Sequence, residues 1–315
     1  RERIREIRQL HVSSFIAASR IAAPSPVCVL PLAPERGHGL VDSLGFPPPD
    51  GRCYPQHMTR CADPSLFAGV ASFLSASTGG RFRFIIGYES EDGAEAAREG
   101  ASIVEGNGGH ALLMPRTLPA PVTAFSVRMV MADGAVYVRA DGEAIIYLGG
   151  RAVDRSREGA PASETALARI DEAVAAFADV ATIPRAEGGW EWVGDGMIGA
   201  YVDRVASRIT SLAQGSTVPA GVRVDEASGL LALVLERVGV PVVEAGAGLT
   251  LRVASDGRTL AASLPEEQVR AALADATSTN PAIPLGVGMY CVDPAFVMDA
   301  DAISAGAALA ALAAR

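Results

Sequence analysis

The chain contains no lysine, and all 27 basic side chains among its 315 residues are arginines. Enzymes that hold a carbonyl substrate as a Schiff base need a lysine, and so does the phosphate-binding P-loop. Both classes are therefore excluded. The 36 acidic residues give a net charge of −9. Because nucleic acids and anionic membranes attract positively charged surfaces, we expect neither to be the main partner.

Cysteine is scarce as well. The four cysteines, at positions 28, 53, 61 and 291, lack the spacing of a disulfide framework, so we expect reduced thiols. Cys53, His57 and Cys61 are four residues apart and could offer three zinc ligands on one helix face. Pro55 argues against a regular helix there, and no fourth ligand is evident nearby. We therefore expect ordinary thiols and no metal at these positions.

Long hydrophobic runs are missing too. None approaches the roughly 20 residues that a membrane-spanning helix needs, and the alanine-rich tail at 303–314 is short and weakly hydrophobic. Near the N-terminus, Arg20 interrupts what could otherwise be the apolar core of a signal peptide. We expect a soluble protein with a cytoplasmic address.

The hydrophobic periodicity predicts alternating helices and strands over most of the chain. The alternation predicts an α/β fold: a mostly parallel sheet of βαβ units with helices on both faces, and a smaller second α/β unit. A further helix is expected at 1–18, before a proline-rich loop at 24–55. The predicted helices span 66–75, 93–105, 121–131, 163–178, 201–213, 230–238, 266–274 and 302–313, and the predicted strands span 82–87, 111–114, 134–139, 141–148, 222–224, 242–244, 249–253 and 259–263.

Five separated blocks of sequence point to one family. They read R-F-I-I-G-Y-E-S-E at 83–91, L-L-M-P-R-T-L-P-A-P-V at 112–122, Y-L-G-G-R-A-V at 147–153, P-R-A-E-G-G-W at 184–190 and M-Y-C-V-D-P-A-F-V-M-D-A-D-A-I-S-A at 289–305. Their content and order resemble the α-D-phosphohexomutases, in particular the actinobacterial phosphomannomutases and phosphoglucomutases. These enzymes interconvert hexose 1- and 6-phosphates.

The resemblance also implies how the chain is organised. Residues 1–62 would form an N-terminal helix and a proline-rich segment, and residues 63–185 a first domain like that of the family. Residues 186–275 would be a reduced second domain, and residues 276–315 a remnant of the third. We expect the fourth domain, which would follow Arg315, to be absent. The chain thus resembles a truncated and degenerate member of the family.

The reactive loop of the family is missing. The resemblance implies a T-A-S-H-N-P loop, whose serine carries the transferable phosphate, between the third strand and Y-L-G-G. Asp141, Gly142 and Glu143 stand there instead, and no serine or threonine occurs from Val127 to Gly150. We therefore expect no catalytic residue for phosphoryl transfer.

The metal and sugar loops also depart from the family pattern. The family's N-D-P-D-A-D-R loop holds Mg²⁺ through three aspartates, and it aligns with 252–258 here. Val253, Ser255 and Gly257 replace the three aspartates, so no Mg²⁺ cofactor is expected. The paired glutamates that hold sugar hydroxyls would fall at 284–287, which read P-L-G-V, and an arginine of the first turn has become Glu91.

Arg258 and Asp256 remain as relics of a substrate-binding loop. Arg258 could still hold a phosphate, but a surface ion pair with Asp256 is the more common role of such an arginine. We therefore expect weak sugar-phosphate binding at most.

The other conspicuous residues have structural explanations. Trp190 and Trp192 could stack a sugar, although tryptophans at a domain junction usually pack. The G-N-G-G-H run at 106–110 looks like a phosphate cradle, but it ends a predicted helix and so indicates a C-cap. None of the four histidines, at 11, 38, 57 and 110, has an acidic or cysteine partner at a spacing that indicates a triad.

Four hypotheses about function stay open. The first is a catalytically inactive homologue that serves as a binding or assembly module, as a homodimer or with another chain, because internal deletions would uncover the apolar strand at 249–253. The second is a hexose-phosphate mutase that needs a partner chain for its missing loops. The third is a new enzyme that uses Asp141, Glu143 and Asp256 as acid or base groups. The fourth is a sequence that drifts without selection.

Overall fold

The computed structural model describes residues 61–153, 161–213, 221–277, 285 and 287–312. These residues all belong to one compact unit, Pro47–Arg315. The helix expected at 1–18, the proline-rich segment and the cysteines at 28 and 53 lie outside the described residues.

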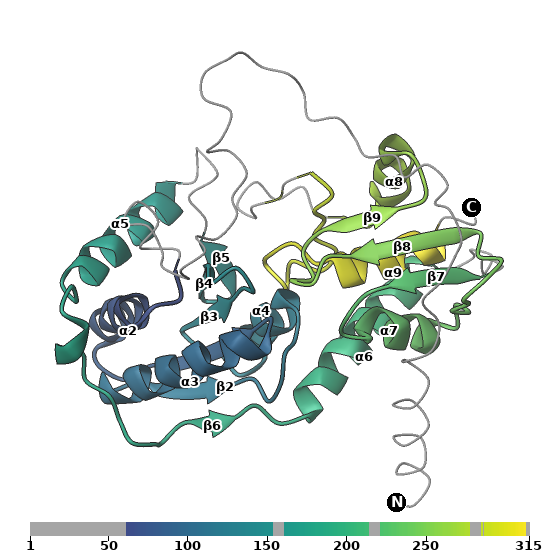
Figure 1. Ribbon diagram of the computed structural model, residues 1–315. Coiled ribbons are helices and arrows are strands. Elements are labelled where there is room, and N and C mark those ends of the chain that lie inside the picture. The colour runs from purple at the N-terminus through teal and green to yellow at the C-terminus, as the bar shows by residue number, and fades with distance from the viewer. Residues whose placement is uncertain (1–60, 154–160, 214–220, 278–284, 286, 313–315) are drawn as a thin grey trace, which may run out of the picture. The chain divides into compact units, whose positions relative to one another are not determined.

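Six strands form the first sheet (Figure 1), in the order β5-β4-β3-β1-β2-β6. Its centre is parallel, because β1 (Arg83–Tyr88) pairs in parallel with both β2 (His110–Leu113) and β3 (Gly134–Val138). The hairpin strands β4 (Ala144–Leu148) and β5 (Arg151–Val153) continue from β3 in antiparallel pairing, and β6 (Glu191–Trp192) lies parallel to β2 at the other edge. Gly149 and Gly150 make the β4–β5 turn, where both have a positive φ (56° and 85°) that hairpin turns of this length require.

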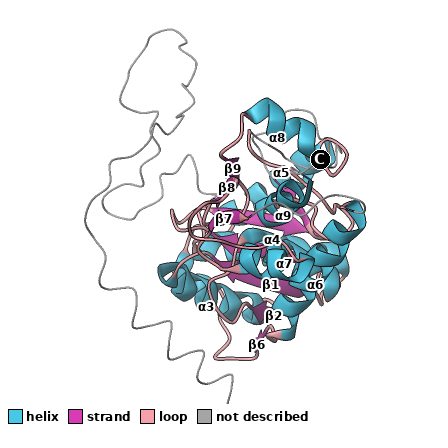
Figure 2. Ribbon diagram, turned by 90° about the vertical axis from the view of Figure 1, so that its right-hand side faces the viewer, coloured by secondary structure: helices cyan, strands magenta, loops and turns pink. Residues whose placement is uncertain are grey.

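Helices cover both faces of this sheet. After β1 the chain crosses to β2 through α3 (Glu91–Gly106), and after β2 it returns past β1 to β3 through α4 (Ala120–Met129). Two right-handed crossovers in opposite directions place their helices on opposite faces. Helix α2 (Pro64–Thr78) packs with α3 and also with α5 (Pro161–Ala175). Figure 2 shows the strands enclosed by these helices.

A three-stranded sheet organises the C-terminal part. Its strands β7 (Val222–Asp225), β8 (Leu249–Val253) and β9 (Leu260–Ala262) lie in that order. The strand β8 is parallel to β7 and antiparallel to β9. Four helices accompany the sheet: α6 (Gly196–Leu212), α7 (Leu230–Val238), α8 (Glu266–Leu273) and α9 (Ala302–Leu312).

Helix α9 is the centre of this C-terminal core. Each of its residues from Ala302 to Leu312 is buried, and the helix contacts α6, α7, α8, β8 and β9. This arrangement corrects one expectation. The strand at 249–253 is neither an edge strand nor uncovered, since it lies between two strands and Leu249 and Leu251 are buried. The remaining elements therefore close over the gap that the deletions imply.

Most predicted elements are present within a few residues of their expected bounds, and the α/β fold class is confirmed. The segment at 242–244 is not a strand, because it makes a single bridge between Val242 and Val222. The short strands β5 and β6 were both missed by the sequence analysis. The domain boundaries stay a prediction.

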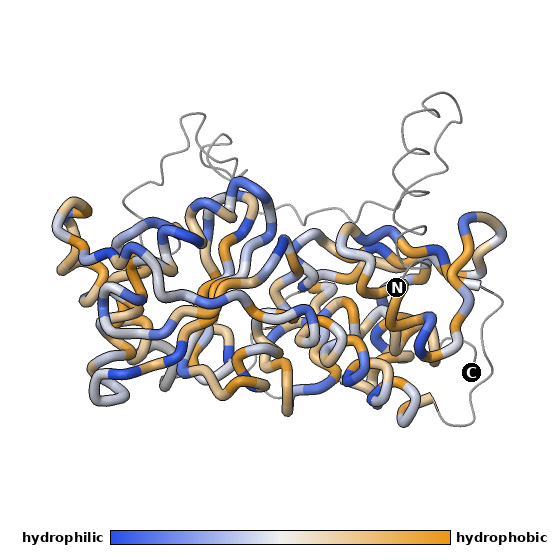
Figure 3. Tube along the Cα trace, turned by 90° about the horizontal axis from the view of Figure 1, so that it is seen from below, coloured by the Kyte–Doolittle hydropathy of each residue, from blue (hydrophilic) through white to orange (hydrophobic). Residues whose placement is uncertain are grey.

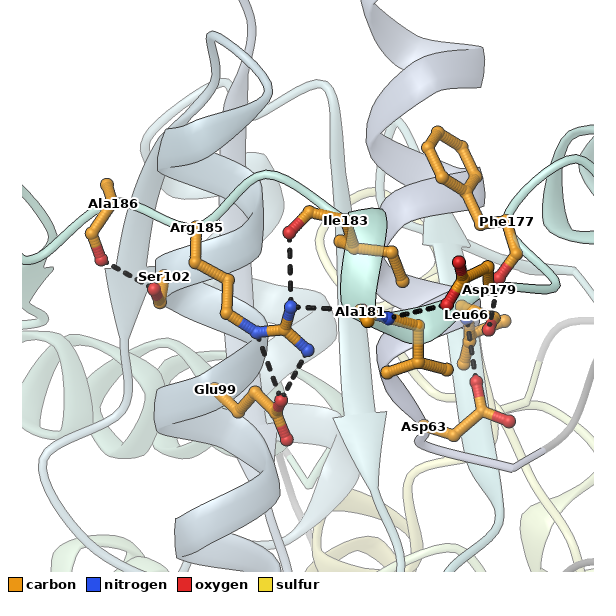
Figure 4. Close-up of polar contacts among 12 residues, drawn as sticks. Asp63, Leu66, Glu99, Ser102, Phe177, Asp179, Ala181, Ile183, Arg185 and Ala186 are labelled. Carbon is orange, nitrogen blue, oxygen red and sulfur yellow. Dashed lines mark hydrogen bonds and ion pairs between the residues drawn. The ribbon is translucent and has the colours of Figure 1, made fainter.

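The connection from α5 to β6 runs across α2 and α3 and is fixed by polar contacts (Figure 4). Ser65 of α2 donates through Oγ to the carbonyl oxygen of Phe177 (2.9 Å). Arg185 of the P-R-A-E-G-G-W block binds the Glu99 carboxylate (2.8 Å), and the backbone N–H of Ala186 donates to the carbonyl oxygen of Ser102 (2.9 Å). The short 3₁₀ helix η2 (Val180–Thr182) lies within this connection. The P-R-A-E-G-G-W block at 184–190 therefore fixes the connection between α5 and β6 to α3.

Apolar residues fill the interior of the described structure. Figure 3 shows orange, hydrophobic stretches running through the inside of the trace and blue stretches mostly at its loops. The largest fully buried side chains are Tyr137, Tyr147, Tyr201, Phe67, Phe84 and Phe125. Among the described residues, no helix is both long enough and apolar enough to span a bilayer.

Candidate functional site

The topology of the first sheet marks one place for a site. The chain leaves β1 toward β2 on one side, whereas β3 lies on the other side of β1. In open α/β sheets, ligands bind beyond the carboxyl ends of the strands at such a switch point. The residues that follow β1 and β3, together with the N-terminus of α4, therefore form the candidate site.

The connection from β3 to β4 is a closed turn at this edge. The backbone N–H of Arg139 donates to the carbonyl oxygen of Glu143 (2.8 Å), and that of Gly142 donates to the carbonyl oxygen of Arg139 (3.1 Å). Cys61 forms an antiparallel bridge with Glu143. The adjacent N–H of Ala62 donates to the carbonyl oxygen of Gly142 (2.9 Å). No residue of this turn is a serine or a threonine.

The acidic residues of the turn are neutralised locally. The Nη1 atom of Arg139 lies 3.2 Å from Asp141 Oδ2 and 3.2 Å from Glu143 Oε2. Among the described residues, no hydrogen bond or ion pair links Asp256 to Asp141 or Glu143. The three carboxylates considered as acid or base groups are thus not joined into one catalytic group.

Two buried hydroxyls near the ends of β1 and β3 have no hydrogen-bond partner among the residues that the structure describes. They belong to Tyr137 of β3 and Thr123 of α4, and both residues are fully buried. Gly87 of β1 makes room for them, because a Cβ at this position would lie 2.1 Å from Thr123 Oγ1 and 3.1 Å from Tyr137 Cδ2. Burial, and then the charges of Glu89 and Asp256, raise the pKa of the Tyr137 hydroxyl. Sequence reasoning missed both residues, since only the fold brings α4 and β3 into contact.

The turn between β8 and β9, which the resemblance aligns with the metal loop of the family, packs against α4. The backbone N–H of Ala120 donates to the carbonyl oxygen of Asp256 (2.8 Å). Gly257 has φ +75°, and a Cβ there would lie 2.4 Å from Pro119 Cβ. The Asp256 carboxylate accepts the backbone N–H of Arg258 (2.9 Å). Mg²⁺ needs several oxygen ligands in near-octahedral geometry, and this turn, with one engaged carboxylate, does not fit the ion.

Arg258 is buried, and its partner is not Asp256. Its Nη2 atom lies 2.9 Å from Asp299 Oδ1, and the exposed fractions of the two side chains are 11% and 0%. The hydroxyl of Tyr147 donates to Asp299 Oδ2 (2.8 Å). Burial is the largest single influence and lowers the pKa of Arg258. The charge and hydrogen bond of Asp299, with the charges of Tyr147 and Asp256, together raise it further, and the net shift is upward. The expected surface pair of Arg258 and Asp256 is therefore wrong, and the guanidinium is already engaged.

A second buried carboxylate lies two residues further on. Asp301 precedes α9, and its Oδ1 accepts the backbone N–H groups of Ile303 (3.1 Å) and Ser304 (3.0 Å) and the hydroxyl of Tyr201 (2.8 Å). Burial raises the pKa of Asp301. Asp299 and Asp301 thus tie the M-D-A-D-A-I-S-A block to β4, to the β8–β9 turn and to α6. The Asp-x-Asp spacing before a helix signals the cap, but no local pattern reveals the two tyrosine partners.

The remaining expectations have mixed outcomes. The G-N-G-G-H run is a helix C-cap, as predicted, because α3 ends at Gly106 and the N–H of Gly109 donates to the carbonyl oxygen of Val104 (3.0 Å). His110 does have acidic neighbours: its Nδ1 lies 3.2 Å from Glu105 Oε1, and its Nε2 lies 4.0 Å from Glu191 Oε2. Trp192 is half exposed, at 50%.

The cysteines differ from the expectation of reduced thiols. Cys61 is disulfide-bonded, whereas Cys291 is free and buried. Burial raises the pKa of the Cys291 thiol to about 12, so this thiol is unreactive. The other two candidate zinc ligands, Cys53 and His57, lie outside the described residues. Within the described part of the chain, no group of three or more histidines, cysteines or acidic residues could hold a metal ion.

Comparisons with known proteins give a sequence relative and several solved structures with a similar fold. No family model matches the chain. A probable phosphomannomutase of Haemophilus influenzae is 30% identical over 130 residues, which are 39% of this chain and 26% of the relative. The match thus spans about a quarter of that protein's length.

Two solved structures share the fold at low identity. A putative phosphomannomutase from Thermus thermophilus aligns with a TM-score of 0.61 and 14% identity, over 81% of this chain and 76% of that one. A phosphoglucomutase/phosphomannomutase family protein from Burkholderia thailandensis aligns with a TM-score of 0.56 and 13% identity, over 84% and 78% of the two chains. The partial sequence match and the shared fold both support kinship with the phosphohexomutase family.

Proposed function

We propose that the chain is a phosphohexomutase homologue without mutase activity that serves as a binding or assembly module. The β3–β4 connection supports this proposal most directly. The family resemblance implies a phosphoserine loop there, whereas this chain has a turn closed by its own hydrogen bonds and covered by Cys61 and Ala62. Without a residue that accepts the phosphoryl group, the two-step transfer of the family has no carrier.

The loop at 253–258 supports the same conclusion. Its groups are engaged in packing: the Asp256 carbonyl oxygen with α4, the Gly257 carbonyl oxygen with the N–H of Ala302 (2.9 Å), and the Arg258 guanidinium with Asp299. Because these groups of the turn already contact other parts of the protein, the turn does not offer the several oxygen ligands that Mg²⁺ needs. The loop therefore has a structural role in place of a catalytic one.

A coupled assay for hexose 1-phosphate to 6-phosphate conversion tests the proposal. It is run with mannose and glucose phosphates, with and without Mg²⁺ and a hexose bisphosphate activator. We expect turnover at the level of the blank. Turnover that scales with the amount of the purified chain would contradict the proposal.

Association with a second copy or with another protein is part of the proposal. The reason drawn from the sequence, an uncovered strand at 249–253, does not apply, since β8 is covered by α9. Light scattering at micromolar concentration tests association directly. More than one chain per particle supports an assembly role, and a monomer that captures no partner argues against it.

The cytoplasmic address also remains a proposal. The disulfide bond of Cys61 argues against it, because disulfides persist mainly in oxidising compartments. Alkylation of thiols in intact cells before isolation distinguishes a cytoplasmic protein from a protein of an oxidising compartment. A cytoplasmic protein should label at Cys61, and a protein from an oxidising compartment should not.

A further inference from the structure

We propose that β6, the outer strand of the first sheet, binds an extended protein segment in which basic and β-branched residues alternate. The inference rests on the proposed function, because it names the class of partner that a binding module of this fold would take. Three observations carry it: the edge of β6 is uncovered, the backbone of Trp192 faces outward there, and the segment around it is acidic.

The edge at β6 is the uncovered one among the sheet edges of the described structure. The two sheets end at β5 and β6 and at β7 and β9. The other three edges are covered by bridges: Arg151 with Met298, Val222 with Val242, and Thr259 with Met289. No described residue pairs with the outer side of β6, which lies beyond β2 at the margin of the sheet (Figure 1). An uncovered edge is a template for pairing with another chain.

The backbone of Trp192 is oriented for such pairing. The strand β6 is parallel to β2, and the N–H of Val193 donates to the carbonyl oxygen of Leu113 (2.8 Å). Because successive residues of a strand direct their N–H and C=O groups to opposite sides, both backbone groups of Trp192 point away from β2. A chain that adds to this edge would bond to both of them, which is how extended peptides bind the edges of sheets.

The side chains of β6 indicate what the added chain carries. Successive side chains of a strand lie on opposite faces of the sheet, so Glu191 and Trp192 offer a carboxylate on one face and an indole ring on the other. The Glu191 side chain is 71% exposed, and Trp192 is half exposed. Pairs of opposite charge, and pairs of an aromatic with a β-branched residue, stabilise neighbouring strands. A segment with basic residues on one face and β-branched residues on the other therefore complements β6.

The charge of this edge favours a basic partner over a second copy of the chain. The segment 187–195 has three exposed acidic residues, Glu187, Glu191 and Asp195, and no basic one. Within the described residues, the ion pair of Glu191 is a long one, with Nε2 of His110 4.0 Å from its Oε2. Two copies that paired through β6 would bring their acidic segments together, and like charges on adjacent strands repel each other. A basic segment would be attracted instead.

Intrinsic fluorescence tests the inference, because both tryptophans of the chain, Trp190 and Trp192, lie at this edge. The probe is a capped peptide of alternating threonine and arginine, T-R-T-R-T-R-T, titrated to millimolar concentration. The control peptide has glutamate in place of arginine. We expect saturable binding of the arginine peptide and no binding of the glutamate peptide.

Two further arginine peptides test the pairing of the backbone. One carries N-methyl groups at its threonines, and the other carries them at its arginines. A strand that is added to an edge uses only alternate N–H groups for the pairing. We therefore expect one of these two peptides to lose binding and the other to keep it.

Two substitutions on β6 and one away from it locate the binding. We expect the arginine peptide to bind about tenfold more weakly to Glu191→Arg and about fivefold more weakly to Trp192→Ala, since each variant loses one cross-strand pair. Both side chains are exposed, so the variants should fold as the unmodified chain does. The control is Glu236→Arg, at an exposed carboxylate on α7, which should bind the peptide unchanged.

The absence of saturable binding of the arginine peptide would overturn the inference. So would equal or tighter binding of the glutamate peptide, equal affinities of the two N-methylated peptides, or unchanged affinity in either β6 variant. A dimer of the free chain that Trp192→Ala dissociates would show that a second copy occupies the edge, and would also overturn it. These results are independent of the mutase assay, because turnover there would overturn the proposed function whatever the peptide data show.

Discussion

At the residue scale, Arg258 is a buried charge with a buried partner. The sequence resemblance aligns it with the last residue of the family's metal loop, and in the structure it forms an ion pair with Asp299. Tyr147 adds a hydrogen bond to the same carboxylate. Both charges of this pair and the hydroxyl of Tyr147 are therefore used in packing within the protein.

Removal of the Asp299 charge should destabilise the protein strongly. In Asp299→Asn the Arg258 guanidinium stays buried without a counter-charge, which typically costs about 3–5 kcal/mol. Chemical denaturation measures the difference. The control is Asp203→Asn, which breaks a pair with Arg237 in which both side chains are 59% exposed and should cost less than about 1 kcal/mol. Equal effects of the two substitutions would mean that the buried pair is not formed in solution.

Gly257→Ala should destabilise more than Gly246→Ala. The two glycines have nearly the same φ, +75° and +73°, so the backbone strain of an alanine is matched at about 1–2 kcal/mol. Only at Gly257 does the new Cβ meet another group, Pro119 Cβ at 2.4 Å, while nothing lies within 4 Å at Gly246. The difference in Tm between the two variants therefore reports the contact of this turn with α4. Identical Tm values would show that the contact is absent.

At the element scale, the strands and helices could be predicted because their patterns are local. Periodicity gave α7 (Leu230–Val238) and β8 (Leu249–Val253) with their observed bounds. The two-residue strand β6 has no such pattern, and its pairing with β2 depends on how the connection after α5 crosses α3. For the site, the sequence showed only which residues of the family pattern are missing, and not which contacts replace them. The pairs of Tyr147 with Asp299 and Tyr201 with Asp301 join residues that are 152 and 100 positions apart, which no local pattern encodes.

The cap of α9 should make stability depend on pH in an unusual direction. Burial raises the pKa of Asp301 in the folded state above its value of 3.8. The folded state then holds the proton more tightly than the unfolded chain, so this residue favours folding at low pH and less so as pH rises from 3.8 through the folded pKa. Denaturation at a series of pH values, compared with Asp301→Asn, measures this. The free energy of unfolding of the variant, relative to that of the unmodified protein, should increase as pH rises from 3.8 through the folded pKa. A relative free energy that decreases over this range would contradict the raised pKa.

Helix α9 should tolerate no cavity, because every one of its residues is buried. Leu309→Ala removes a fully buried side chain, and we expect a loss of about 2–5 kcal/mol in the free energy of unfolding. The matched control is Leu233→Ala on α7, where the side chain is 46% exposed and the loss should stay below about 1 kcal/mol. A small loss at Leu309 would mean that α9 is not the centre of the C-terminal core.

At the scale of the whole molecule, the described residues form a six-stranded sheet and a three-stranded sheet, each with its helices. The resemblance assigns the six-stranded sheet to the first domain of the family. The segment that the resemblance assigns to the third domain, including α9, forms one core with β7, β8 and β9. The turn at 253–258, which the resemblance aligns with the metal loop of the family, lies at the contact between the two sheets. The closed β3–β4 turn and the packed turn at 253–258 are therefore two parts of one proposal, in which the fold is kept and the phosphoryl chemistry is not.

The intact mass of the protein after incubation with a hexose bisphosphate and Mg²⁺ tests this account most directly. An active phosphohexomutase takes up a phosphoryl group on its reactive serine, whereas this chain has no serine or threonine from Val127 to Gly150. We expect the mass to stay that of the unmodified chain. A gain of one phosphoryl group, located by peptide mapping to a residue at the carboxyl edge of β1 and β3, would contradict the account.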